Sequence, residues 1–214
     1  MTRQALQSRL ERAPIVPLIQ AEDPGVAVAT AHALIAGGLT VLEVVLRTEA
    51  ALQCLREVVD AAPEAIVGAG TVLSESQARA CIDAGAAFLV SPGLSAPVVA
   101  AAQAAGVDVI PGVATATEAQ TGWNLDLRVL KFFPAGQAGG IPMLKALSAV
   151  FRDVKFMPTG GVSAGNLAEY LALDAVIACG GSWLTPAAAI ARGDFETVTR
   201  LALEACVIAR EVRG

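Results

Sequence analysis

Lys131 is the only amine within a long run of bulky apolar residues, the segment from Val129 to Pro134. The chain has only two other lysines, Lys145 and Lys155. Burial in apolar surroundings penalises the charged form of an amine and so favours the neutral form. A neutral amine is a nucleophile toward carbonyl carbons. The segment therefore predicts that Lys131 forms Schiff bases.

A carboxylate and a guanidinium are expected on the same side of a second apolar strand, at residues 41–47. Side chains alternate along a strand, so Leu42 faces the helices while Glu43 and Arg47 point into the interior of a barrel. An interior Glu43 beside Lys131 forms an acid/base and nucleophile pair. The alternative is a structural Lys131–Glu43 ion pair. Arg47 is expected to hold a carboxylate group, although it could also be an ordinary cation at a strand end.

The other titratable candidates fit this chemistry less well. Lys145 is predicted to lie in a helix, and Lys155 begins its strand, at the end opposite the usual site of barrel enzymes. His32, the only histidine, is expected to be a packing or surface residue. Because the sequence has no cluster of His, Cys and carboxylates, no catalytic zinc and no other metal is predicted. Trp123 and Trp183 are expected to be packing residues.

Paired glycines end the last two predicted strands, at 160–161 and 180–181, and Ser182 follows the second pair. Glycine pairs expose backbone N–H groups, and the loops after strands seven and eight of a barrel commonly bind phosphate. We therefore favour a phosphate site there, with tight turns that hold no ligand as the alternative. Thr71 ends the segment 68–71, whose glycines fit either tight packing or a role in the site.

Size and composition limit the class of protein. The chain has 214 residues, of which 55% are hydrophobic and 16% charged, which predicts one domain, residues 1–214, with a large core. A net charge of −5 gives no general attraction to nucleic acid or anionic membranes. Four scattered cysteines and the absence of an apolar segment in residues 1–13 favour a cytoplasmic protein with reduced thiols and no signal peptide.

Strand and helix patterns alternate eight times. This repeat predicts a parallel sheet, closed as a single (β/α)₈ TIM barrel of the α/β class with an extra N-terminal helix within residues 1–13; an open doubly wound sheet is the competitor. The uncharged segment 24–42 is predicted to be a helix, a turn and a strand rather than a membrane span. The expected strands are 15–20, 41–47, 65–72, 88–93, 108–115, 129–135, 155–161 and 175–184. The expected helices are 2–12, 24–36, 49–61, 74–84, 96–105, 117–123, 141–150, 163–171 and 194–210.

Local signals predict where several helices begin and end. Side chains that can accept a hydrogen bond from the first helical turn favour N-caps at Ser74, Ser163 and Asp194. Glycines that can adopt the left-handed conformation are expected after helix ends. These glycines are Gly37, Gly85 and Gly106.

Six short motifs occur in an order that resembles the 2-keto-3-deoxy-6-phosphogluconate (KDPG) aldolases, which also act as 4-hydroxy-2-oxoglutarate (KHG) aldolases. The resemblance extends from about Pro14 to Ala205. It implies a class I aldolase of the Entner–Doudoroff pathway, built as a homotrimer of (β/α)₈ barrels and using no cofactor. The motifs are LEVVLRT at 42–48, VGAGTV at 67–72, SPG at 91–93, KFFPA at 131–135, PTGG at 158–161 and GGSWL at 180–184.

The resemblance also implies a role for each site residue. Lys131 is the Schiff-base lysine and Glu43 the general acid/base. The pyruvyl carboxylate is held by Arg47 and Thr71. The remaining residues are Pro92 and Phe133, which line that pocket, and Thr159, Gly160, Gly161 and Ser182, which surround the distal phosphate.

The chain departs from the family pattern at Gly136, because members of this family often have Glu after the Phe-Pro-Ala sequence. This difference affects the loop beside the site, but not the residues assigned to the chemistry.

Two other functions remain as alternatives. A sugar-phosphate epimerase or isomerase would use the same phosphate site without a borohydride-trappable adduct. A non-catalytic sugar-phosphate-binding barrel would release no pyruvate.

Overall fold

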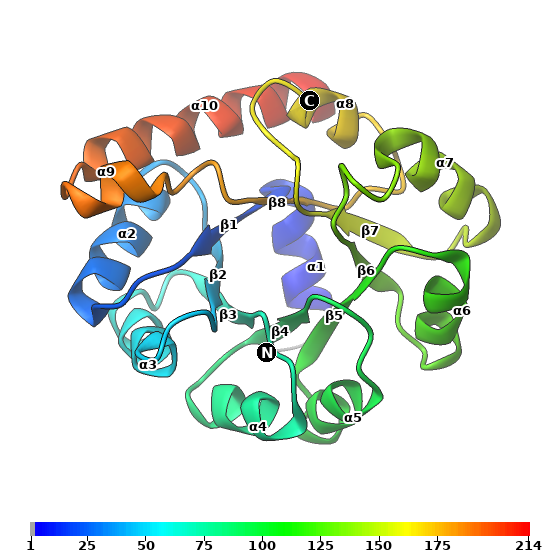
Figure 1. Ribbon diagram of the computed structural model, residues 1–214. Coiled ribbons are helices and arrows are strands. Elements are labelled where there is room, and N and C mark those ends of the chain that lie inside the picture. Colours follow the sequence, from blue (N-terminus) through cyan, green and yellow to red (C-terminus); the bar gives the residue numbers. More distant parts are fainter. Residues whose placement is uncertain (1–2) are drawn as a thin grey trace.

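The structure is a computed structural model that describes the backbone of residues 3–214 and the side chains of residues 6–214 (Figure 1). Position 2, where the leading helix was expected to begin, lies outside the described residues. The strands are β1 (Ile15–Ile19), β2 (Val41–Val45), β3 (Ile66–Gly70), β4 (Phe88–Ser91), β5 (Asp108–Val113), β6 (Val129–Phe132), β7 (Lys155–Pro158) and β8 (Cys179–Gly181). The helices are α1 (Arg3–Arg12), α2 (Pro24–Ala36), α3 (Ala51–Ala61), α4 (Glu75–Asp83), α5 (Ala96–Ala105), α6 (Ala116–Asn124), α7 (Gly140–Val150), α8 (Leu167–Leu171), α9 (Ala187–Ala191) and α10 (Phe195–Arg213).

The eight strands form one parallel sheet that closes on itself. The strand order is β7-β6-β5-β4-β3-β2-β1-β8, and two isolated bridges, Phe156 with Val176 and Thr159 with Gly180, join the last strand to β7. Figure 1 shows the helices as an outer ring around the strands. The predicted TIM barrel is confirmed, and the open doubly wound sheet is rejected because its edge strands would not pair.

Side chains of the strands alternate between two apolar clusters, one outside the barrel and one inside it. Leu42, Val44, Leu130 and Phe132 belong to the larger cluster between the sheet and the helices. Val41 belongs to a smaller cluster inside the barrel. The alternation therefore follows the prediction, which leaves Glu43 and Lys131 on the inner side of β2 and β6.

Helix α1 covers one end of the barrel and confirms the extra N-terminal helix. Its Leu6 and Leu10 are buried in the inner cluster together with Phe88 and Met157. Figure 1 shows this helix behind the centre of the ring of strands. Because α1 closes this end, the interior opens to solvent at the carboxyl ends of the strands, where barrel enzymes carry their sites.

The segment 24–42 forms helix α2, a turn at Gly37-Gly38 and strand β2, as predicted. Among the residues that the structure describes, no helix is both long and apolar enough to span a membrane. The left-handed residue of this turn is Gly38, with φ 92°, rather than the predicted Gly37, whose φ is −81°. Gly37 instead lets α10 approach, since an added Cβ would lie 2.3 Å from the Cβ of Ala202.

Two of the three predicted helix N-caps are confirmed. Ser74 accepts a hydrogen bond from the Gln77 backbone N–H at 3.2 Å, and Asp194 accepts one from Thr197 at 3.1 Å. The prediction for Ser163 is wrong, because helix α8 begins later, after Asn166. The Asn166 side chain instead ties the intervening turn to the strand end, accepting from the Ser163 N–H at 2.8 Å and donating to the Gly161 carbonyl at 2.9 Å. The short helix α9 was not predicted.

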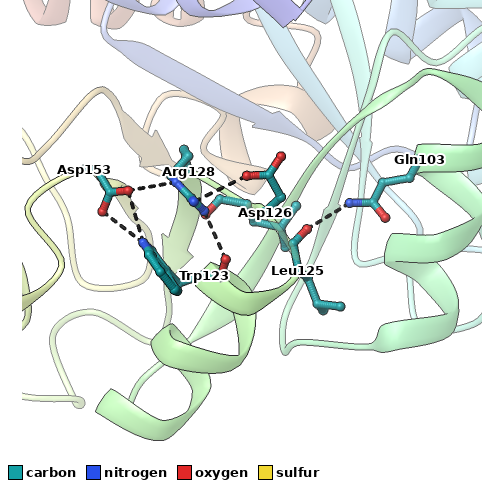
Figure 2. A network of polar contacts seen from close by, with 7 residues as sticks. Gln103, Trp123, Leu125, Asp126, Arg128 and Asp153 are labelled. Carbon is teal, nitrogen blue, oxygen red and sulfur yellow. Dashed lines mark hydrogen bonds and ion pairs between the residues drawn. The ribbon is translucent and has the colours of Figure 1, made fainter.

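A surface network fixes the start of β6, the strand that carries Lys131 (Figure 2). Arg128 contacts Asp153 through Nε at 2.9 Å and Asp126 at 3.3 Å. The Trp123 indole lies 5.0 Å from the Arg128 guanidinium and donates to both Asp153 oxygens at 3.1 Å. Trp123 is 41% exposed, so its packing contact with Arg128 lies at the surface and not in the core. It works as an amphipathic surface residue that holds the α6–β6 connection.

Candidate active site

Lys131 and Glu43 meet inside the barrel, as the alternation predicted. Lys131 extends from β6 and is 4% exposed, and Glu43 extends from β2 and is completely buried. The Lys131 Nζ lies 3.6 Å from the Glu43 Oε1. A buried ion pair adds little net stability because both charges lose their hydration. A gain in stability is therefore a weak explanation for this pair.

The Glu43 carboxylate is held by packing. Neither of its oxygens has a hydrogen-bond partner among the described residues, and its ionic contact is with Lys131. A buried carboxylate without hydrogen bonds is costly, and such groups are concentrated at functional sites. Both oxygens therefore have hydrogen-bonding capacity that no described residue uses.

An aromatic wall stands beside the lysine. The Phe133 ring centroid lies 5.2 Å from the Lys131 Nζ, which is within the range of a cation–π contact. The same ring lies against Gly160, where an added Cβ would be 3.3 Å from the Phe133 Cε2. Phe133 thus connects the lysine to the glycine pair after β7, and the structure brings these three predicted residues together.

Arg47 and Thr71 form a second polar group at the rim. Arg47 is exposed, and its Nε donates to the Thr71 Oγ1 at 3.2 Å. Thr71 follows β3 and has φ 60°, a left-handed conformation that is unfavourable for a β-branched residue. Strained residues of this kind cluster at ligand sites. The pair presents a planar guanidinium and a hydroxyl at the carboxyl ends of two neighbouring strands, β2 and β3.

The residues proposed for the phosphate lie where β7 and β8 end. Thr159 is buried and bridges Gly180, and Gly160 and Gly161 have φ values of 85° and 87°. Both glycines are therefore required by the backbone conformation, whether or not a ligand binds. Hydrogen bonds from Ala135 to the Thr159 carbonyl and from Gly136 to the Gly160 carbonyl, both 2.8 Å, hold this loop against the end of β6.

A cleft of about 570 Å³ lies at the carboxyl ends of β1, β2 and β8, and neither Lys131 nor Glu43 lines it. Arg47 and Ser182 both line it, which places two predicted binding residues on one cavity although no direct contact joins them. Its walls are largely apolar and include Leu18 and Val45, but Glu22 and Asp23 also line it. The volume suits a small metabolite of this size class.

The backbone of Pro92 lies in close contact with Gly112 of β5. It follows β4 and is half-buried. An added Cβ on Gly112 would lie 2.0 Å from the Pro92 carbonyl oxygen, so this glycine of β5 permits the approach. This contact was not predictable from the sequence, since it depends on which strands become neighbours.

The rival residues lie outside the site. Lys145 is exposed on α7, and Lys155 donates to the Asp174 carbonyl at 2.7 Å from the opposite end of β7. His32 is exposed on α2 and contacts the Ala61 carbonyl at 3.1 Å, which confirms a surface role. Cys179 on β8 directly precedes the glycine pair at 180–181, but burial raises the pKa of its thiol to about 12, so it stays neutral.

Comparison with known proteins agrees with this geometry. The model of the aldolase family "KDPG and KHG aldolase" matches residues 6–201. The chain belongs to this family. Among curated relatives, the KHG/KDPG aldolase of Escherichia coli is 46% identical over 199 residues, covering 93% of both chains. The 2-dehydro-3-deoxy-phosphogluconate aldolase of Dickeya dadantii is 45% identical over 196 residues and 92% of both.

Solved structures of the family have the same fold. The KDPG aldolase of Zymomonas mobilis with 3-phosphoglycerate has a TM-score of 0.90 and 40% identity, over 99% of both chains. The KDPG aldolase of Legionella pneumophila, with pyruvate captured as a covalent carbinolamine intermediate, has a TM-score of 0.89 and 41% identity. It covers 92% of this chain and 96% of the other. The family and the aldolase class predicted from the motifs are thus confirmed.

Proposed function

We propose that this chain is a class I Schiff-base aldolase that cleaves KDPG to pyruvate and glyceraldehyde 3-phosphate. It also cleaves 4-hydroxy-2-oxoglutarate to pyruvate and glyoxylate. The single observation that carries the proposal is the buried Lys131 amine, which lies 3.6 Å from the Glu43 carboxylate inside the barrel. Membership of the KDPG and KHG aldolase family supports it.

Lys131 begins the reaction by attacking the C2 ketone of the substrate. The carbinolamine loses water to give an iminium, which accepts electrons from the neighbouring carbon. Glu43 takes the proton of the C4 hydroxyl, directly or through a water, and the C3–C4 bond breaks. The aldehyde leaves, the enamine is protonated at C3, and addition of water to the iminium releases pyruvate and the free Lys131 amine.

The remaining residues hold the two ends of the substrate. Arg47 and Thr71 bind the carboxylate, because a guanidinium fork and a hydroxyl match its two oxygens. Pro92 and Phe133 line the pocket around the pyruvyl part. Thr159, Gly160, Gly161 and Ser182 surround the phosphate through backbone N–H and hydroxyl donors.

We also propose that residues 1–214 act as one barrel domain, with no cofactor and no metal, in the cytoplasm. The assembly is a homotrimer, as the resemblance to the family implies. Sedimentation equilibrium measures the assembly directly. A monomer mass at enzyme working concentration would reject the trimer and leave the aldolase proposal unaffected.

A coupled assay tests the activity. Lactate dehydrogenase and NADH report pyruvate release from KDPG, and Lys131→Ala is expected to abolish it because neither of the other two lysines lies in the site. Lys145→Ala is the matched control, since this exposed helix residue lies outside the site, and it should retain wild-type rates. Ligand binding by the wild type without pyruvate release would favour a non-catalytic barrel. Turnover of a sugar phosphate without pyruvate would favour an epimerase or isomerase.

A further inference from the structure

The Glu43 carboxylate lies against the backbone of Gly70, the last residue of β3. An added Cβ on Gly70 would lie 2.0 Å from the Glu43 Oε1, 2.6 Å from its Cδ and 2.7 Å from its Cγ. Real Cβ atoms essentially never come within 3.0 Å of a nonbonded heavy atom. The space that a side chain would fill at residue 70 is therefore the space that the carboxylate occupies.

The backbone of Gly70 does not itself require glycine. Its φ lies outside the left-handed range, unlike that of Thr71, which follows it and has φ 60°. An alanine in an ordinary strand conformation is normally more favourable than glycine, which loses more conformational freedom on folding. The absence of a side chain at this position therefore has to be explained by the neighbour, Glu43.

No hydrogen bond from the described residues fixes this carboxylate, since both of its oxygens lack a partner there. Its place is set by the walls around it, and Gly70 is the wall on the β3 side. The two strands are in register at Val45 and Gly70 and at Glu43 and Gly68. The Glu43 side chain thus runs along the inner surface of β3 toward its open end.

Gly68 shows that the other inward glycine of β3 serves a different purpose. An added Cβ there would lie 2.4 Å from the Phe88 Cζ. Phe88 is fully buried in the inner cluster, so Gly68 makes room for the apolar core. Along one strand, therefore, the first glycine accommodates packing and the second accommodates the acid.

We propose that Gly70 is a positioning residue for the aldol reaction, because it leaves the space that holds the Glu43 carboxylate within reach of Lys131 and the substrate. This inference rests on the proposed function, in which Glu43 transfers the proton. A methyl group at residue 70 would move the carboxylate by at least about 1 Å, and a displacement of this size costs about 100-fold in rate.

The first test is the steady-state rate of Gly70→Ala in the coupled pyruvate assay. The expected result is a kcat about 100-fold lower, with KM changed far less, because the carboxylate of the substrate is held elsewhere by Arg47 and Thr71. Gly93→Ala is the matched control: it adds the same methyl near the end of β4, where no atom lies within 4 Å. It should keep the wild-type kcat. A wild-type kcat for Gly70→Ala overturns the inference.

The second test separates positioning from a general loss of structure. Glu43→Asp lowers kcat by withdrawing the carboxylate, but its shorter side chain also vacates the space beside residue 70. In the Glu43→Asp background, Gly70→Ala should therefore cost less than about 5-fold, in place of about 100-fold in the wild type. Equal losses in both backgrounds would mean that Gly70 does not act through Glu43, and would overturn the inference.

A folding defect in Gly70→Ala leaves the inference testable. Should that variant not fold, Gly70→Ala combined with Glu43→Ala is expected to fold, as judged by circular dichroism and thermal unfolding, since the opposing side chain is gone. Failure of this double variant to fold overturns the inference. Glu43→Gln distinguishes the role of Glu43 from the role of Gly70. Full activity of Glu43→Gln refutes proton transfer by Glu43 itself. An inactive Glu43→Gln together with a fully active Gly70→Ala refutes only the positioning role.

Discussion

Replacing Thr71 by glycine and by alanine should reverse the usual order of stability of these two residues in a strand-like segment. At ordinary positions, glycine is less stable than alanine by about 0.5–1 kcal/mol because it loses more conformational freedom. Thr71 has φ 60°, where any residue with a Cβ pays about 1–2 kcal/mol. Both variants lose the hydroxyl that accepts from the Arg47 Nε at 3.2 Å, so their difference isolates the backbone strain.

The balance favours Thr71→Gly over Thr71→Ala by about 0.5–1 kcal/mol in free energy of unfolding. For a chain of this length, that corresponds to a melting temperature about 1–4 °C higher. Differential scanning calorimetry at equal protein concentration measures it. Both variants should also raise KM for the keto acid by a similar factor. A Thr71→Ala variant that melts above Thr71→Gly would refute the claim that the segment stores strain.

Three other expectations follow from single contacts. Hydrogen bonds from the Ala114 N–H, and from the hydroxyl and N–H of Thr115, lower the pKa of Glu118 below 4.5. The stability that Glu118 adds to α6 is thus present above about pH 4.5 and is lost as pH falls through its lower folded-state pKa. In urea unfolding, Glu118→Gln should lower the free energy of unfolding by about 1 kcal/mol at pH 7 and by less at pH 3. Burial raises the pKa of Cys81 to about 11 and that of Cys179 to about 12. A thiol reagent at pH 8 should therefore modify the half-buried Cys206 first, and Cys81 and Cys179 only after unfolding. Rapid labelling of Cys179 in the native protein would contradict this. Gly180→Ala should lower the free energy of unfolding by about 1–3 kcal/mol and weaken phosphate binding, because the added Cβ would lie 2.2 Å from the Thr159 Oγ1. Adding Thr159→Ala to this variant should restore the stability, because it removes that oxygen.

Strand alternation carried most of what the sequence could predict about the site. The inward direction of Glu43 and Lys131 depends only on a period of two and on the closure of the sheet, so both were predictable from 41–47 and 129–135. The pairing of the two side chains across the barrel is confirmed at 3.6 Å. Their chemical roles and those of the binding residues remain predictions.

Side-chain contacts between neighbouring strands were not predictable in the same way. The segment 68–71 offered no means of distinguishing Gly68, which accommodates Phe88, from Gly70, which accommodates Glu43, because the difference arises only from the neighbouring strands. The start of α8 was also misplaced. Ser163 has a suitable side chain, but Asn166 forms two hydrogen bonds that continue the turn and delay the helix.

The central claim is that the buried amine of Lys131 forms a covalent bond with a keto acid. Incubation with pyruvate and sodium borohydride, followed by peptide mass mapping, measures this directly. The account predicts a reduced pyruvyl adduct on the peptide that contains Lys131, with cleavage activity lost in proportion to labelling. An adduct on Lys145 or Lys155, or none while KDPG is still cleaved, would contradict it.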